Sequence, residues 1–185
     1  GHIHTQTMAP GNGDRLKDLS NKGIDTNIED WKNNDGYILL CPSSPTVTFR
    51  QNNMTQEEWI TETGNTLLQY TDRPIRMRNK PRPGNKWWNT DIKDELKGAH
   101  ALVTNMSLSA IDAIKFGVPA FTDIDNIASP VSNTDISNIE SPMKPNKQII
   151  NEWINCIVEN QFTLDEIGSG IACEILKRQN EDTIL

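Results

Sequence analysis

Four short strand-like runs, each separated from the next by a helix-like segment, are the feature that most restricts how this chain can fold. Three of them are nearly continuous apolar runs and one alternates apolar and basic residues; they span residues 37–41, 74–78, 99–104 and 118–121. Each ends at small or polar residues, as buried strands of a parallel sheet do. Strands that alternate with helices favour a doubly wound parallel sheet. We therefore predict an α/β domain with a Rossmann-like parallel sheet flanked by helices.

Helix signals fill the segments between and after these runs. Thr55 and Glu58 have the spacing of a capping box, and apolar residues then recur on one helical face. The polar stretch 123–145 contains three prolines and predicts a long loop. Further helices are expected over residues 91–97, 110–116, 147–160 and 163–179.

The first 35 residues differ in composition from the rest. They are rich in Gly, Asn and Asp and contain few large apolar groups. We predict an irregular N-terminal arm or linker over residues 1–35, with at most a short helix at 14–21, and the Rossmann-like domain over residues 36–180.

Charge and cysteine usage restrict the class of partner. The net charge is -7, and an acidic chain lacks the basic field that general binding to nucleic acids or membrane surfaces needs. The three cysteines are far apart and show no disulfide framework. We find no signal-peptide pattern and no apolar run long enough to cross a bilayer. These features predict a cytoplasmic protein with no membrane partner.

The strand–turn–helix segment over residues 103–119 is the strongest candidate for a ligand site. Asn105, Ser107 and Ser109 lie in the turn, where hydroxyls can cap the helix or bind a ligand oxygen. A helix start at the carboxyl edge of a sheet suits a phosphate. Asp112, one turn further, is placed to accept hydrogen bonds from sugar hydroxyls. The alternative is that Ser107 only caps the helix and that Asp112 is only a solvent-exposed helix residue.

A basic run is the second candidate. Arg76 and Arg78 share one face of the predicted strand, and Lys80 and Arg82 continue past its carboxyl end. Arg and Lys both bind phosphate groups. The alternatives are a solvated strand edge or ion pairs with the acidic helix at 91–95. The run holds six basic residues and no acid: Arg73, Arg76, Arg78, Lys80, Arg82 and Lys86.

Two weaker signals follow other strands. Ser43 and Ser44 come after the first strand, where small residues let a ligand approach the backbone, although such a motif is often only a turn. Asp123 and Asp125 follow the fourth strand, and we favour loop capping over contact with a sugar or metal. No metal-ligand set, Ser-His-Asp set or P-loop is present, so we predict no metal and no cofactor.

Residues 99–120 resemble the C-terminal, donor-binding half of GT-B glycosyltransferases. The shared features are the strand, the Ser-rich turn, the Asp112-Ala113 pair and the Gly117-Val-Pro119 motif. Capsule-polysaccharide transferases and nucleotide-sugar 2-epimerases have this arrangement. The basic run at residues 76–83 is similar to an Arg-Pro-His-Pro stretch of the capsule type, but Asn79-Lys80-Pro81 stands where that stretch has His-Pro. Residues 37–176 as a whole also resemble uncharacterised GT-B-like proteins carried by bacteriophages.

The resemblance implies a metal-independent donor domain that binds a nucleotide or a nucleotide-activated sugar. Ser107, Ser109, Arg76, Arg78 and Lys80 would stabilise the departing phosphate. The general base usually comes from a first domain that this chain does not contain, so no catalytic residue is assigned. The open alternatives are a non-catalytic nucleotide- or protein-binding module and a nucleotide-sugar epimerase. Nucleic acid is considered only as an acceptor of the transferred sugar. A homodimer is an open alternative for the assembly of the chain. If the chain is encoded by a phage, it would act in the host cytoplasm.

Overall fold

A four-stranded, all-parallel sheet forms the centre of the structure, a computed structural model that describes residues 13–182. The strand order is β2-β1-β3-β4, with Ile38 of β1 opposite Ile75 on one side and Ala101 on the other. This confirms the predicted α/β fold with a Rossmann-like parallel sheet. The strands are β1 (Tyr37–Leu40), β2 (Ile75–Met77), β3 (Ala99–Val103) and β4 (Ala120–Phe121).

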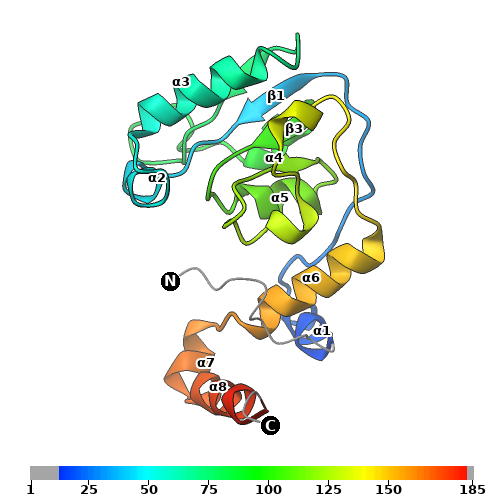
Figure 1. Cartoon of the computed structure of the whole chain (residues 1–185). Helices are drawn as coiled ribbons and strands as arrows, with labels where there is room; N and C mark the ends of the chain where they lie inside the picture. The colour runs from blue at the N-terminus through cyan, green and yellow to red at the C-terminus, as the bar shows by residue number, and fades with distance from the viewer. Residues whose placement is uncertain (1–12, 183–185) are drawn as a thin grey trace. The chain divides into compact units, whose positions relative to one another are not determined.

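Helices cover both faces of this sheet. On one face α3 (Gln56–Leu67) packs Trp59 and Leu67 into the core formed by alternate residues of β1 and β3. On the other face lie α4 (Ile92–Leu96) and α5 (Ser109–Lys115) (Figure 1). The helices fall on opposite faces because the chain moves one way across the sheet from β1 to β2 and the other way from β3 to β4, and such crossovers are right-handed.

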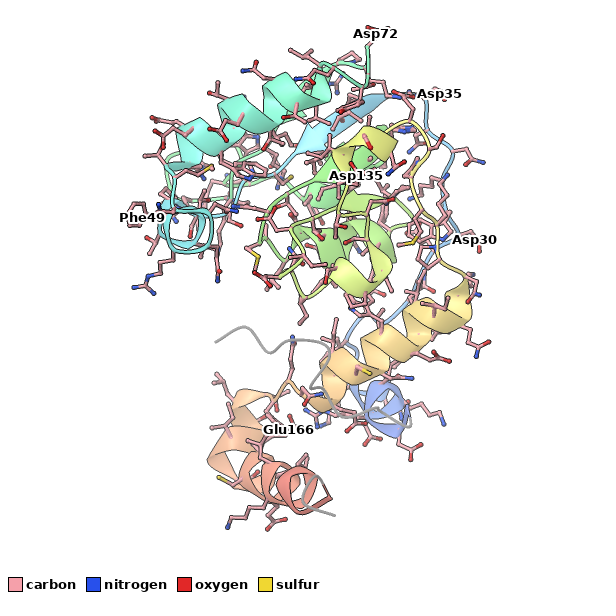
Figure 2. All side chains as sticks on the ribbon, viewed as in Figure 1. Asp30, Asp35, Phe49, Asp72, Asp135 and Glu166 are labelled. Atoms are coloured by element: carbon pink, nitrogen blue, oxygen red, sulfur yellow. The ribbon has the colours of Figure 1, made fainter. Side chains whose placement is uncertain are left out.

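Local signals set the helix starts. Thr55 and Glu58 form the predicted capping box at α3. Helix α2 (Pro45–Asn52) was not predicted, and it begins at Pro42-Ser-Ser-Pro45, which the sequence indicates only as the loop after the first strand. Ser44 is its N-cap and Pro45 its first residue, a position that proline favours. Thr48 faces inward, while Phe49 points away from the sheet unit (Figure 2).

The long stretch from β4 to residue 146 is mostly irregular, as expected. It contains two short 3-10 turns, η2 (Ser129–Val131) and η3 (Ile136–Asn138). Ile139 packs into the same core as α3. His100 of β3 is partly buried, and its two ring nitrogens lie 3.0 and 2.9 Å from the carbonyl oxygens of Asn34 and Ile139.

Contacts divide the chain into a sheet unit, residues 27–146, and a helical unit. The helical unit contains α1 (Asp14–Asn21), α6 (Lys147–Glu159), α7 (Leu164–Gly168) and α8 (Ile171–Asp182). The sequence analysis instead divides the chain only after residue 35. Its single helix over 163–179 is wrong, because Gly170 adopts a φ of +84° and separates α7 from α8. Across residues 13–182, no helix has the length and apolarity that a membrane span requires.

One arginine links the elements of the helical unit. The Arg15 guanidinium donates hydrogen bonds to both carboxylate oxygens of Glu166, at 2.7 and 2.8 Å, and to the carbonyls of Val158 and Gln161. Glu166, labelled in Figure 2, also completes a capping box with Thr163. The bonds from Arg15, together with those from Thr163, lower the pKa of Glu166 to about 2.

Gly117 ends α5 and provides a test of the sheet unit. Its φ is +72°, and a Cβ there would overlap the carbonyl oxygen of Asp30. We expect Gly117→Ala to lower the free energy of unfolding by more than about 2 kcal/mol, because the left-handed conformation alone costs about 1–2 kcal/mol. Gly84→Ala is the matched control, since Gly84 has a φ of +85° and open space around it. Urea unfolding that shows equal losses in the two variants would contradict the predicted overlap.

The Arg15–Glu166 pair predicts a pH dependence. The folded-state pKa of Glu166 lies below its ordinary value of 4.5, so the pair stabilises the fold above that pH. This contribution is lost as the pH falls from about 4.5 to about 2. We expect thermal unfolding, followed from about pH 6 to about pH 2.5, to show a steeper loss of stability in the wild type than in Glu166→Gln. Parallel curves would mean that the pair contributes nothing.

Candidate functional site

A cavity of about 850 Å³ opens at the carboxyl edge of the sheet, lined by the segments that follow β1, β2 and β3. The chain changes direction across the sheet between β1 and β3, because β2 lies on one side of this pair and β4 on the other. Ligands of open α/β sheets bind at such a switch point. The volume falls in the range of about 300–1,000 Å³ that is usual for small-molecule sites.

Three helices begin at this cavity. Their N-cap residues, Ser44 of α2, Asp91 of α4 and Leu108 of α5, all line it. Asp91 accepts a hydrogen bond from the Lys93 amide, so its carboxylate offsets the positive end of α4. At α5 the Ser109 amide already donates to the Ser107 hydroxyl. Ser44 makes no side-chain cap, which leaves the first turn of α2 as the best place for an anion.

The walls combine apolar side chains with a few polar groups, as in most small-molecule sites. The apolar contribution comes from Pro42, Val47, Pro81, Ile92, Met106 and Leu108.

Seven of the ten residues predicted from the sequence line the cavity, and three do not. Those that line it are Ser43, Ser44, Arg78, Lys80, Ser107, Ser109 and Asp112. Arg76, Arg82 and Asn105 lie outside the lining, and each has a different role.

Arg78 reaches the cavity but is held within the protein. Its side chain is 4% exposed and pairs with Glu95 at 2.7 Å. The guanidinium also donates to the hydroxyl and the carbonyl of Thr90, at 2.8 and 3.0 Å. This is the pairing with the acidic helix that the sequence analysis left as an alternative. Arg78 thus fixes both ends of the loop between β2 and α4, and most of its donors are already used.

The other basic residues differ in position. Arg76 stacks on the Tyr37 ring, 3.8 Å from its centroid. Arg82 is exposed, and its backbone amide and carbonyl are both hydrogen-bonded to Asn85. Lys80 is exposed at the cavity wall and forms no ion pair with any residue of the described range. Of the basic run, Lys80 is therefore the cation best placed to meet a ligand.

Asn105 lies outside the cavity lining and is hydrogen-bonded within the protein. It is fully buried, and its Oδ1 accepts a hydrogen bond from the Ser43 amide at 2.9 Å. Its Nδ2 donates to Thr48 Oγ1 at 3.2 Å and to Asn52 Oδ1 at 2.9 Å. The Ser43 hydroxyl in turn accepts a hydrogen bond from the Met106 amide at 3.1 Å. The two loops that line the cavity after β1 and β3 are thereby tied together.

Two titratable groups of the cavity have shifted pKa values. Asp112 is accessible within the cavity, yet loss of hydration at the concave wall raises its pKa, and the charge of Asp91 adds to this effect. Burial raises the pKa of the Cys41 thiol to about 12. Cys41 is therefore a neutral thiol at physiological pH.

The sequence analysis missed the contribution of the loop between β2 and α4. Asn79, Asn89, Thr90 and Asp91 all line the cavity. Asn79 directly follows a predicted strand, so its place at the carboxyl edge could have been anticipated. The return of residues 89–91 to the same cavity depends on the contact between Arg78 and Thr90, for which the sequence carries no local signal.

Asp123, which follows the fourth strand, is hydrogen-bonded within the protein. Asp123 accepts a hydrogen bond from Asn52 at 2.7 Å.

A second depression, of about 640 Å³, lies at the opposite end of the sheet unit, beside Asp35 and Asp72 (Figure 2). Its charged centre, Arg73 and Glu140, is already paired at 2.9 Å. Within residues 13–182, no group of three or more His, Cys, Asp or Glu side chains is arranged to hold a metal ion.

Comparisons with known proteins found no matching family model, curated protein or solved structure. The cavity is therefore interpreted from its own geometry.

Arg78 provides the test of how this site is built. Replacing it with Met leaves Glu95 and Thr90 without their partner, so we expect the free energy of unfolding to fall by about 2–3 kcal/mol. The loss should be smaller than for a fully buried pair, because Glu95 is 30% exposed. Arg76→Met is the control and should cost less than about 1 kcal/mol. Similar losses in the two variants, measured by urea unfolding, would contradict the assigned role of Arg78.

Proposed function

We propose that the sheet unit binds a nucleotide or nucleotide-activated sugar in the cavity between the ends of β1 and β3. The observation that carries this proposal is that the uncapped start of α2 and Lys80 line one cavity, at the switch point of a parallel sheet. Backbone amides at a helix start together with a lysine suit a phosphate group. The apolar wall offers a surface for a base, and the acceptor Asp112 suits sugar hydroxyls.

The activity that fits such a ligand is glycosyl transfer, with this chain as the donor-binding part. The resemblance of residues 99–120 to GT-B donor domains supports this choice. In that mechanism the amides of α2 and Lys80 would stabilise the negative charge that develops on the departing phosphate. Arg78 would act by holding the loop that carries Lys80, rather than by touching the phosphate.

A non-catalytic nucleotide-binding module is the second candidate. It is favoured by the internal use of Arg76 and Arg78, which leaves Lys80 as the main cation at the cavity. Both candidates bind the same class of ligand, so binding is the property to test first.

A thermal-shift screen against UDP, GDP, CMP, ADP, TDP and their common sugar conjugates tests the proposal. One nucleotide, at 100 times its dissociation constant, should raise the Tm by about 5–10 °C, since this corresponds to about 2.7 kcal/mol. Lys80→Ala should weaken binding about five- to tenfold. Lys86→Ala is the matched control, because Lys86 lies over Trp87 and does not line the cavity. No shift with any compound would defeat the proposed function.

A further inference from the structure

Two polar side-chain atoms at the wall of the cavity lack a hydrogen-bond partner. Asn79 Oδ1 and Ser109 Oγ are both buried, and neither forms a regular hydrogen bond within the described part of the chain. Ser109 Oγ lies close enough to the Cys41 thiol to influence its pKa, but a thiol is a weak partner. Buried polar atoms without partners are rare in folded proteins, and each calls for an explanation.

The position of Asn79 is fixed by its neighbours. It directly follows Arg78, whose guanidinium is held by Glu95 and Thr90 on α4 and the loop before it. The Arg78 amide also donates to the Leu40 carbonyl, at 2.9 Å, and so continues the pairing of β2 with β1. These contacts hold the backbone directly before Asn79, so that less backbone freedom remains to be lost when a ligand binds.

The chemistry of the two atoms restricts what can satisfy them. An amide oxygen only accepts hydrogen bonds, whereas a serine hydroxyl both donates and accepts. A ligand hydroxyl can donate to Asn79 Oδ1 and accept from another group at the same time. Asp112, in the same cavity, is a further acceptor. Several acceptors around one cavity favour a ligand that presents several O–H groups, and disfavour a second phosphate at this wall.

We infer that Asn79 is a specificity-determining residue, and that its side-chain oxygen, with Ser109 beside the same cavity, receives a hydroxyl group of the sugar part of the ligand. This inference rests on the proposed function, since it divides the cavity into two subsites. The phosphate lies at the start of α2 and Lys80, and the sugar lies between the end of β2 and α5. The ligand is then a nucleotide-sugar rather than a bare nucleotide.

The first measurement uses the ligand-free protein. Asn79→Leu replaces an unpartnered amide with an apolar group of similar size, so the Tm should stay level or rise by about 2–4 °C. Asn89→Leu, an exposed cavity residue of the same loop, is the matched control and should leave the Tm within about 1 °C of the wild type. A fall of several degrees in Asn79→Leu alone would reveal a structural partner for the amide and overturn the inference.

The second measurement compares affinities for bare nucleotides and their sugar conjugates by calorimetry, with UDP and UDP-glucose, and GDP and GDP-mannose, as probes. Asn79→Leu should weaken binding of the sugar conjugate about tenfold and leave the bare nucleotide unchanged. Asn79→Asp keeps the acceptor oxygen and should retain conjugate binding to within about threefold.

The outcomes separate this inference from the proposed function. If the wild type binds none of the nucleotides or conjugates, the proposed function fails and the sugar subsite fails with it. If the wild type binds but Asn79→Leu weakens both members of a pair equally, or weakens neither, the inference alone fails. If Asn79→Asp loses conjugate binding as completely as Asn79→Leu, the side chain donates to the ligand and the assigned acceptor role is wrong.

Discussion

The buried side chain of Asn105 connects the two chain segments that leave the middle of the sheet. Its amide accepts from the Ser43 backbone and donates to Thr48 and Asn52 of α2. A parallel sheet that changes direction leaves a gap between the ends of its central strands, and the loops there have no partner strand. A fully satisfied polar network holds such loops in one arrangement, because each unpaired member would be costly once buried. The cavity and the start of α2 depend on this network.

Arg78 plays the same part on the other side of the cavity. It looks like a phosphate ligand in the sequence, but it pairs with Glu95 and Thr90 and shapes the loop that brings Asn79, Lys80 and Asp91 to the site. A buried guanidinium needs partners in the free protein, and those partners leave few donors for a ligand. In the proposed function, the exposed Lys80 and the amides of α2 therefore take the phosphate-binding role that the basic run suggested for the arginines.

Much of the sheet unit follows from short-range signals. Each predicted strand is present. β1, β3 and β4 are buried apolar runs, as expected for strands of a parallel sheet that helices cover on both faces. β2 lies at the edge of the sheet and is mostly exposed. The capping box at Thr55 and Glu58 needs only neighbours three residues apart. Elements whose boundaries depend on a single backbone angle were harder to anticipate, and the break at Gly170 between α7 and α8 is the example.

The sequence by itself determined the fold class, the carboxyl edge as the place of the site, and the serines that lie there. These follow from periodicity and from the direction of parallel strands, which are properties of neighbouring residues. Only the tertiary structure decided which polar groups are consumed internally and which stay open to a ligand. Arg78 and Asn105 are consumed, whereas Lys80 is exposed and the buried Asn79 Oδ1 has no hydrogen-bond partner among the described residues. That difference depends on partners 12 to 62 positions away in the chain, whose approach only the packing of the sheet brings about.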